Sequence, residues 1–311
     1  MISNFTYNEK LYGLENEFLE MVNLYENNKL PNKILLSGLK GTGKCTLAYH
    51  LINYFLSRFD NEKYSIENFS ININSSTFKL LQNGSNPNFH IIDIKPEKKN
   101  IDINQIRELI IKLNKSSFND KPRFILIDNI ELLNINSINA LLKIVEEPNS
   151  NLYFFLIHNN NVKILDTLNS RCIKFRMFLQ NSEKLEIINN LLNNNFYSEL
   201  NADFKTMYNS PGEILKLYNF FKEQNINDSI SIEEFINLII EKNLFKKSLF
   251  IKKNLGAFIE LYFQKKINFY KSKDKFYNLY KYFLFKINEC NKYNLDIESI
   301  LIEFEGKIIN G

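Results

Sequence analysis

The sequence predicts an α/β phosphate-loop domain, a parallel sheet with flanking helices, followed by an all-helical C-terminal part. Short runs rich in β-branched and aromatic residues alternate with helical patterns through the first half of the chain, as in parallel sheets covered by helices. A glycine-rich loop that ends in Lys44 follows the first of these runs. Pro211 is the last of the 6 prolines, so the chain beyond it can be helical without interruption.

The candidate strands are the apolar runs at residues 33–36, 89–94, 124–127, 152–157 and 173–175. Residues 34–36 and 124–127 show no polar alternation, as expected of strands that are buried on both faces. A helix is predicted for residues 137–147, where apolar residues recur at three- and four-residue spacing and Pro148 follows.

Helices are predicted for most of the chain after residue 181. One helical segment covers about 182–210, and the next helix begins at Ser210 and Pro211, which suit a cap and a first turn. Ser231 and Glu234 have the spacing of a capping box. The later helical patterns, which indicate a separate bundle, cover residues 245–263, 276–287 and 297–308.

Length and composition limit the class of protein. A chain of 311 residues favours two or three domains. Its net charge of +4 is compatible with nucleic-acid contact without demonstrating it. Cys45, Cys172 and Cys290 lie far apart and form no CxxC pair, so we expect no zinc and a reduced, cytoplasmic setting. No apolar run nears the roughly 20 residues that span a bilayer, so we expect no membrane partner.

Residues 38–44 match the phosphate-loop spacing GxxxxGK between a predicted strand and a predicted helix. Gly38, Gly41 and Gly43 would let backbone N–H groups curl around a phosphate, and Lys44 would reach the outer phosphates. A plain glycine-rich turn does not account for Lys44 in that position. The loop therefore predicts a binding site for ATP or ADP.

The residue after Lys44 should carry a hydroxyl for magnesium, but here it is Cys45. Magnesium prefers oxygen ligands, and a thiol is a poor substitute. Thr46 lies one residue further, about 100° around the helix, and cannot simply replace the missing ligand. We expect weak or absent magnesium binding.

Asp128 follows the buried run 124–127, where an acid commonly makes a second magnesium contact. The alternative is that Asp128 caps the following turn. Asn129 comes next and cannot act as a base. Glu131 lies two residues further along, and we expect that shift to point it elsewhere.

Two motifs resemble the bacterial clamp-loader family of AAA+ proteins. Residues 139–148 are similar to the NALLKxxEEP helix of that family, and residues 170–172 are similar to its SRC motif, with Asn159 in the sensor position between them. The resemblance extends over roughly residues 10–220. It implies an AAA+ phosphate-loop domain at 1–178, a small helical lid at 179–222 and a C-terminal collar for oligomerisation at 223–311.

The resemblance also implies which type of subunit within the family the chain is most similar to. In ATP-hydrolysing subunits a catalytic Glu stands where this chain has Asn129, and an Arg stands where Glu213 follows Pro211 and Gly212. Together with Cys45, these departures favour the delta-prime type of subunit, which has a degenerate nucleotide site. The expected partners are the ATPase and delta subunits of a hetero-oligomeric ring, and through the complex the sliding clamp and primer-template DNA.

In this family the Arg of the SRC motif projects into the nucleotide site of a neighbouring subunit, so the resemblance implies that Arg171 is an arginine finger acting in trans. A permanently charged, forked guanidinium suits the charge that develops during phosphoryl transfer. The alternative is a structural ion pair between Arg171 and Glu146 or Glu147.

Two other functions stay open from the sequence. A catalytically active ATPase subunit of the same loader needs Ser or Thr at position 45 and Glu at position 129, and neither is present. A stand-alone phosphate-loop enzyme, such as a nucleotide kinase, needs an acid or arginine cluster of its own in residues 179–222, and that segment shows none.

Overall fold

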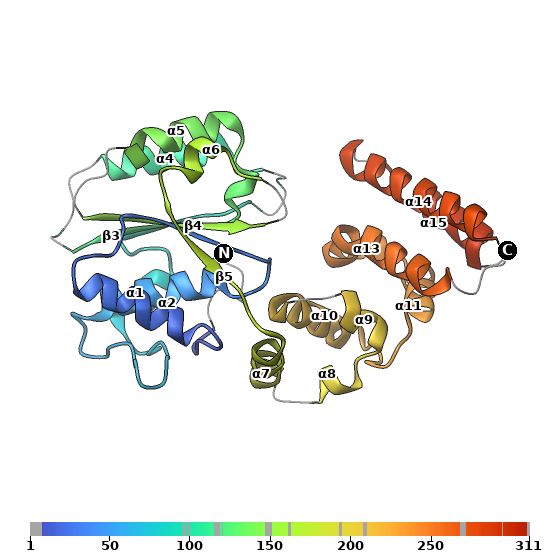
Figure 1. Ribbon diagram of the computed structural model, residues 1–311, viewed down its shortest axis with the longest axis horizontal. Helices are drawn as coiled ribbons and strands as arrows, with labels where there is room; N and C mark the ends of the chain where they lie inside the picture. The colour runs from blue at the N-terminus through green and yellow to red at the C-terminus, as the bar shows by residue number, and fades with distance from the viewer. Residues whose placement is uncertain are drawn as a thin grey trace. The chain divides into compact units, whose positions relative to one another are not determined.

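The structure is a computed structural model that describes residues 8–95, 98, 100–114, 119, 121–146, 151–160, 163–192, 195–207, 210–267, 272–293 and 295–309. The chain folds into two compact units (Figure 1). Unit 1 comprises Met1–Leu191 with Ser210–Gly212, and unit 2 comprises Leu192–Asn209 with Glu213–Gly311. The division into three domains at residues 178 and 222 stays a prediction.

Unit 1 is built on a parallel sheet, as the sequence predicts. Its strands, in spatial order, are β2 (Phe89–Ile92), β3 (Arg123–Ile127), β4 (Leu152–Asn159), β1 (Lys33–Gly38) and β5 (Ile173–Met177). Every described pairing between neighbouring strands is parallel. All the candidate runs are therefore strands, although the run predicted to reach residue 94 ends at Ile92.

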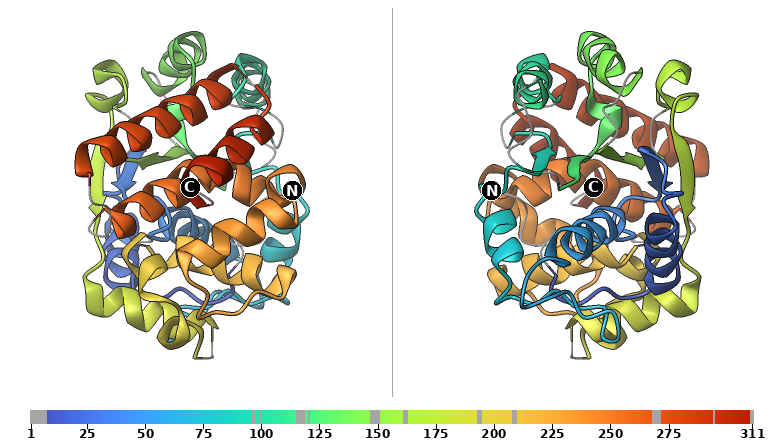
Figure 2. Two further views of the ribbon diagram at one scale, coloured as in Figure 1. Left: turned by 90° about the vertical axis from the view of Figure 1, so that its right-hand side faces the viewer. Right: turned by 90° about the vertical axis from the view of Figure 1, so that its left-hand side faces the viewer.

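Helices cover both faces of this sheet. On one face lie α1 (Glu15–Glu26), α2 (Lys44–Ser57) and α3 (Ser76–Gln82). On the other lie α4 (Ile103–Leu113) and α5 (Ile135–Glu146), and the view onto unit 1 shows the strands between these two layers (Figure 2, right). The predicted helix at 137–147 is α5, and its predicted end at Glu147 and Pro148 lies outside the described residues.

Consecutive side chains of the central strands alternate between the two layers. Leu36 and Phe124 pack with α1 and α2, whereas Leu35 and Ile125 pack with α4 and α5. Because both faces are covered, both sets of side chains are apolar, which explains the continuous hydrophobic runs in the sequence.

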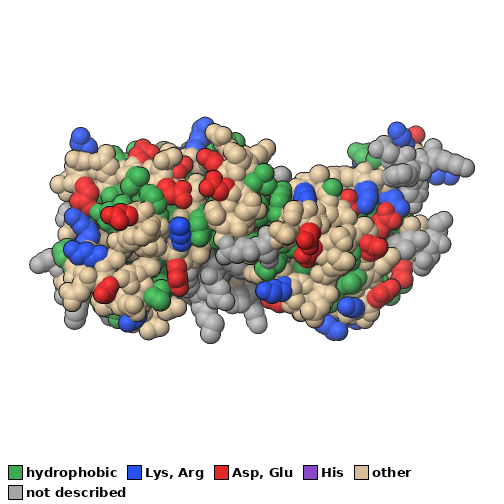
Figure 3. All heavy atoms as spheres, turned by 90° about the horizontal axis from the view of Figure 1, so that it is seen from below, with side chains coloured by type: hydrophobic (Ala, Val, Ile, Leu, Met, Phe, Trp, Pro, Cys, Tyr) green, Lys and Arg blue, Asp and Glu red, His purple; other side chains and the backbone are tan. Residues whose placement is uncertain are grey.

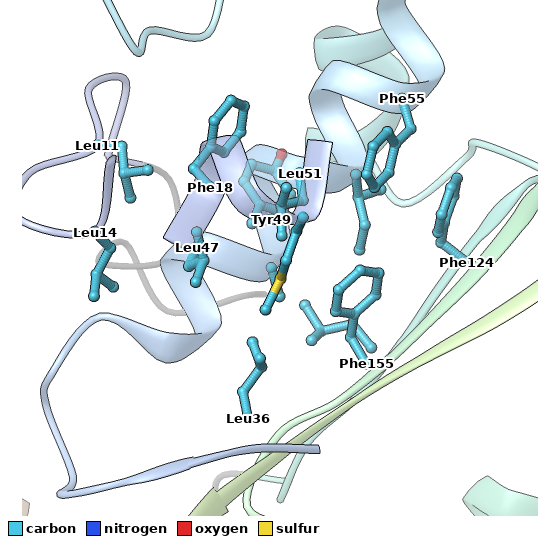
Figure 4. Close-up of a cluster of buried hydrophobic side chains, with 14 of the residues drawn as sticks. Leu11, Leu14, Phe18, Leu36, Leu47, Tyr49, Leu51, Phe55, Phe124 and Phe155 are labelled. Atoms are coloured by element: carbon cyan, nitrogen blue, oxygen red, sulfur yellow. The ribbon is translucent and has the colours of Figure 1, made fainter. Parts of the chain in front are cut away.

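Aromatic stacking fills the core on the α2 side of the sheet (Figure 4). The Phe124 ring stacks on Phe55 of α2 with centroids 5.4 Å apart and on Tyr153 of β4 at the same distance. The Phe155 ring lies 6.3 Å from Phe124. The phosphate loop that joins β1 to α2 is thereby anchored at both ends in a packed core.

Shorter elements complete unit 1. A 3-10 turn, Ile130–Leu132, follows β3, and α6 (Asp166–Asn169) lies between β4 and β5. The helix α7 (Asn181–Leu192) follows β5 and reaches the boundary with unit 2.

Every regular element among the described residues of unit 2 is a helix, as predicted. Its elements are α8 (Phe196–Glu199), α9 (Ala202–Met207), most of α10 (Pro211–Gln224), α11 (Ile232–Glu241), α12 (Leu244–Lys247), α13 (Leu249–Lys266), α14 (Lys273–Tyr293), α15 (Glu298–Phe304) and a π-helical turn (Glu305–Ile309). The predicted capping box is present, since the Ser231 and Glu234 side chains each accept the other's backbone N–H.

Phenylalanine supplies the core of unit 2 in a chain that has no Trp. The Phe235 ring meets Phe204 edge-on at 5.3 Å and Phe258 at 5.1 Å. The helix α13 carries Phe258 and packs against α9, α11, α12 and α14. In the described part of the chain, no helix is both long and apolar enough to cross a membrane.

We expect Phe124→Ala to destabilise unit 1 by about 3–5 kcal/mol, because it leaves a cavity between two stacked rings. Phe178→Ala is the matched control, since Phe178 is 73% exposed, and its effect should stay within about 0.5 kcal/mol. Denaturant unfolding followed by circular dichroism measures both. Equal effects of the two substitutions would contradict this account of the core.

Candidate functional site

The phosphate loop lies between the end of β1 and the start of α2. Gly41 and Gly43 adopt φ of +80° and +88°, a conformation that side-chain-bearing residues rarely take, and Gly43 is the N-terminal cap of the 14-residue α2. A Cβ on Gly38 would lie 2.3 Å from the Met177 carbonyl oxygen of β5. The glycines are therefore required by backbone shape and close packing, and the loop presents its N–H groups at a helix N-terminus, where a phosphate fits.

Lys44 is buried, with 3% of its surface exposed. Its Nζ donates a hydrogen bond to the Gly38 carbonyl oxygen at 3.1 Å and another to the Leu39 carbonyl oxygen. Burial lowers the Lys44 pKa to about 8, and the negative charges of Asp128 and Glu131 partly oppose that shift. The ammonium is thus held at the loop by its own carbonyls and lies in the field of two carboxylates.

Cys45 and Thr46 are half-buried in the first turn of α2. Cys45 packs against the apolar core on the α2 side of the sheet. This environment suits a small hydrophobic residue and not a ligand of a hard cation. The residues present therefore fit a phosphate but do not supply the hydroxyl that magnesium needs beside it. Within the described ranges, no three His, Cys, Asp or Glu side chains group closely enough to hold a metal ion.

The start of α10 lies directly on the phosphate loop. The Gly212 N–H donates to the Gly41 carbonyl oxygen at 2.9 Å, and a Cβ on Gly212 would lie 2.9 Å from the Gly41 Cα. Only a glycine permits this approach without displacing the loop. Glu213 follows in the first turn of α10.

The sheet order brings the carboxyl ends of β3, β4 and β1 side by side, which places Asp128, Asn159 and Gly38 along one edge. Asp128 is half-buried, and its carboxylate accepts the Asn129 N–H at 2.8 Å. Burial and then the neighbouring Asp93 raise the Asp128 pKa to about 6, against the lowering effect of Lys44. As for the capping alternative, Asn129 and not Asp128 is the cap residue of the 3-10 turn.

Glu131 belongs to the site, and the expectation that it points elsewhere is wrong. Its carboxylate accepts the Asn159 side-chain Nδ2 at 2.9 Å and the Asn159 backbone N–H at 3.2 Å. The cause is Asn129, whose φ of 54° and ψ of 52° reverse the chain and start the 3-10 turn that brings Glu131 back to β4. Asn is one of the few residues that adopt this conformation readily, so an Asn directly after the strand is the feature of the sequence that could have indicated the turn.

Asn129 and Asn159 join the strand ends into one hydrogen-bonded network. The Asn159 Nδ2 also donates to Asn129 Oδ1 at 2.8 Å, and the Asn129 Nδ2 donates to Asp93 Oδ1 at 2.9 Å. Sequence reasoning did not find Asp93, which directly follows β2. The amides of Asn129 and Asn159 therefore link two carboxylates, Asp93 and Glu131, in one run of hydrogen bonds.

A second polar cluster, also missed from the sequence, lies where β1 meets β4. The Ser37 hydroxyl donates to Asn160 Oδ1 at 2.7 Å and lies 3.0 Å from His158 Nδ1. The Asn160 N–H donates to the Gly38 carbonyl oxygen at 3.2 Å, the same oxygen that Lys44 uses. This cluster fixes the end of β4 against the start of the loop.

Arg171 lies just after α6 and does not contact the loop residues described above. Its Nη2 pairs with Glu146 Oε1 at 2.9 Å, and its Nη1 donates to the Thr167 carbonyl oxygen at 2.8 Å. The ion pair with Glu146, one of the two alternatives from the sequence, is therefore present. The Arg171 side chain is still 38% exposed. The adjacent Cys172 is buried, and burial raises the pKa of its thiol to about 11, which disfavours the reactive thiolate form.

The sequence and the fold are both similar to replication proteins. The family described as "DNA polymerase III, delta subunit" matches residues 14–181. The DNA polymerase III subunit delta′ of Buchnera aphidicola subsp. Schizaphis graminum is 28% identical over 227 residues, which is 66% of this chain and 67% of that protein. A putative replication factor C small subunit of Acanthamoeba polyphaga mimivirus is 30% identical over 250 residues, 75% of this chain and 66% of that protein.

A solved structure has the same fold. The DNA polymerase III gamma subunit-related protein from Thermotoga maritima is 17% identical, with a TM-score of 0.52 over 91% of this chain and 96% of that chain. At that identity the likeness concerns the fold alone, and it confirms the predicted phosphate-loop domain with a helical C-terminal part. The chain spans about half to two thirds of the length of the first curated relatives it matches.

We expect Asp128→Asn to stabilise unit 1 at neutral pH. Burial raises the folded-state pKa of Asp128 to about 6, above its ordinary value of 3.8, so its charge costs folding free energy above pH 6 and costs none below pH 4. The substitution should add about 1–3 kcal/mol at pH 7, and the gain should vanish as pH falls through 6 towards 4.

Denaturant unfolding of both proteins at pH 4, 5, 6 and 7 measures this difference. Asp166→Asn is the control, because the Asp166 side chain is 80% exposed in a surface pair with Lys163, and it should change stability by less than about 0.5 kcal/mol. A wild type that is more stable than Asp128→Asn at pH 7 would show that the charge is stabilised by its surroundings.

Proposed function

The chain belongs to the DNA polymerase III delta subunit family, and from that premise we propose that it is a delta-prime type subunit of a replicative sliding-clamp loader. In this role it scaffolds the loader ring during DNA replication and hydrolyses no appreciable ATP of its own. The observation that carries the proposal is a phosphate loop of intact backbone geometry without the groups for hydrolysis.

Two groups that hydrolysis needs are missing, one at the start of α2 and one after β3. Cys45 packs into the core at the position where a hydroxyl that binds magnesium would be needed. The Asn129 side chain is hydrogen-bonded to Asp93 and Asn159. Asn129 has no basic group, so it cannot take a proton from an attacking water. A site with these contacts favours a scaffolding role, in which the loop stabilises the fold and does not hydrolyse ATP.

The proposed contribution of this chain to catalysis is Arg171, acting on the nucleotide of a neighbouring subunit. Glu146 and the Thr167 carbonyl hold the guanidinium in one orientation, while more than a third of the side chain stays accessible. An arginine that is oriented in advance loses less side-chain freedom when it enters another site. The ion pair with Glu146 is therefore compatible with a finger.

The proposed partners are the ATPase and delta subunits in a hetero-oligomeric ring, which we place in the cytoplasm. We propose that the helices after residue 222 form the collar that joins the ring. Contact with the clamp and with primer-template DNA is proposed to run through the complex, since basic and acidic side chains are interspersed on the face drawn in Figure 3. ATP or ADP is the proposed ligand of the loop, with weak or absent magnesium, and the absence of zinc stays a prediction.

Arg171→Ala should leave assembly with the partner subunits intact and lower DNA- and clamp-stimulated ATP hydrolysis by the assembled loader. A finger contributes about 10³–10⁵ to the rate at its own site, but the total loss is partial because other subunits carry their own fingers. Arg171→Lys should restore little, because a point charge does not reproduce the fork. ATP binding by the neighbouring subunit should persist.

Two controls separate the finger from a structural ion pair. Arg176→Ala, on the exposed Arg of β5, should leave hydrolysis unchanged. Glu146→Ala breaks the same pair from the other side. If Arg171→Ala and Glu146→Ala both lower the melting temperature while hydrolysis per assembled complex stays normal, Arg171 is structural. Failure of the wild type to assemble with loader subunits would refute the proposed function as a whole.

A further inference from the structure

The donors nearest the carboxyl ends of β4 and β3 are already used inside the protein. The Asn159 side-chain amide donates both of its hydrogens, one to Asn129 Oδ1 at 2.8 Å and one to Glu131 Oε1 at 2.9 Å. The Asn159 backbone N–H is also taken by the second oxygen of Glu131 at 3.2 Å. A ligand group that needed Asn159 would have to displace the Glu131 carboxylate.

The charges at this edge have the wrong sign for a further phosphate. The Lys44 ammonium is in the field of Asp128 and Glu131, and Asp128 is in the field of Asp93. In a phosphate loop the backbone N–H groups take the inner phosphates, and the lysine lies between the second and the third. The third phosphate therefore extends towards these carboxylates, without the magnesium ion that would normally offset its charge.

The inner part of the site has the opposite character. Gly41 and Gly43 shape the loop at the N-terminus of α2, and Lys44 is held at its edge by the Gly38 carbonyl. A phosphate loop uses these groups for the first two phosphates. The hydrogen bonds of Asn159 described above go to Asn129 and Glu131, and not to these groups.

We propose that this site accepts a nucleoside diphosphate and rejects a triphosphate, with Glu131 as the residue that determines the selectivity. The inference deepens the proposed function and rests on it for one point, that the site has no magnesium-dependent hydrolysis to perform. Glu131 excludes the third phosphate by its charge and by occupying Asn159.

Isothermal titration of the full chain with ADP and with the non-hydrolysable triphosphate adenylyl imidodiphosphate, in EDTA, tests this directly. ADP should bind at least about 10-fold more tightly, the effect of one poorly solvated like charge. Glu131→Ala should tighten the triphosphate by about 10-fold and leave ADP within about 3-fold. Lys44→Ala should abolish both, and Glu108→Ala, on the exposed face of α4, should change neither.

Glu131→Gln serves as a second variant if Glu131→Ala does not fold, because it removes the charge and keeps the side-chain length. A triphosphate that binds the wild type as tightly as ADP overturns the proposal. So does an unchanged ratio in the folded variants, an order reversed by magnesium, or no ADP binding. Nucleotide binding by the isolated chain tests the selectivity. The proposed function fails instead if the chain does not assemble with loader subunits or hydrolyses ATP by itself, so the two failures are distinguishable.

Discussion

The Lys44 ammonium is buried at the start of α2, and a buried charge must be hydrogen-bonded or paired. The Gly38 carbonyl accepts from Lys44 and from the Asn160 N–H, which ties the loop to β4. The carboxylates of Asp128 and Glu131 balance the charge from the ends of the neighbouring strands. The edge of the sheet is thus organised around the Lys44 cation.

That arrangement explains why the loop persists although its catalytic groups are absent. The glycines are fixed by local geometry, since Gly38 approaches Met177 and Gly41 is packed under Gly212. Substituting them would disturb β5 and the start of α10 as well as any ligand. The positions that differ from a hydrolytic site, Cys45 and Asn129, have instead taken structural contacts with the core and with Asp93. The same two residues therefore stabilise the fold and lack the groups that ATP hydrolysis needs.

Much of the fold could be predicted because its signals are local. Buried parallel strands appear as continuous apolar runs, and the loop and the Ser231 capping box have fixed spacings. The site was predicted less completely, since hydrogen bonds between strands depend on sheet order, which no short pattern encodes. Glu131 was misplaced because the left-handed backbone at Asn129 redirects the chain. Asp93 and the pair of Ser37 and His158 were missed for the same reason, because their partners lie on other strands.

The central claim is that the chain keeps a phosphate loop without its own hydrolysis. Steady-state hydrolysis of ATP by the purified full chain, with magnesium and with a Lys44→Ala variant as the blank, tests it most directly. We expect the wild type and the blank to be indistinguishable. Steady turnover by the wild type that Lys44→Ala abolishes would contradict it, and would mean that this site, with Cys45 and Asn129 in place, performs the chemistry itself.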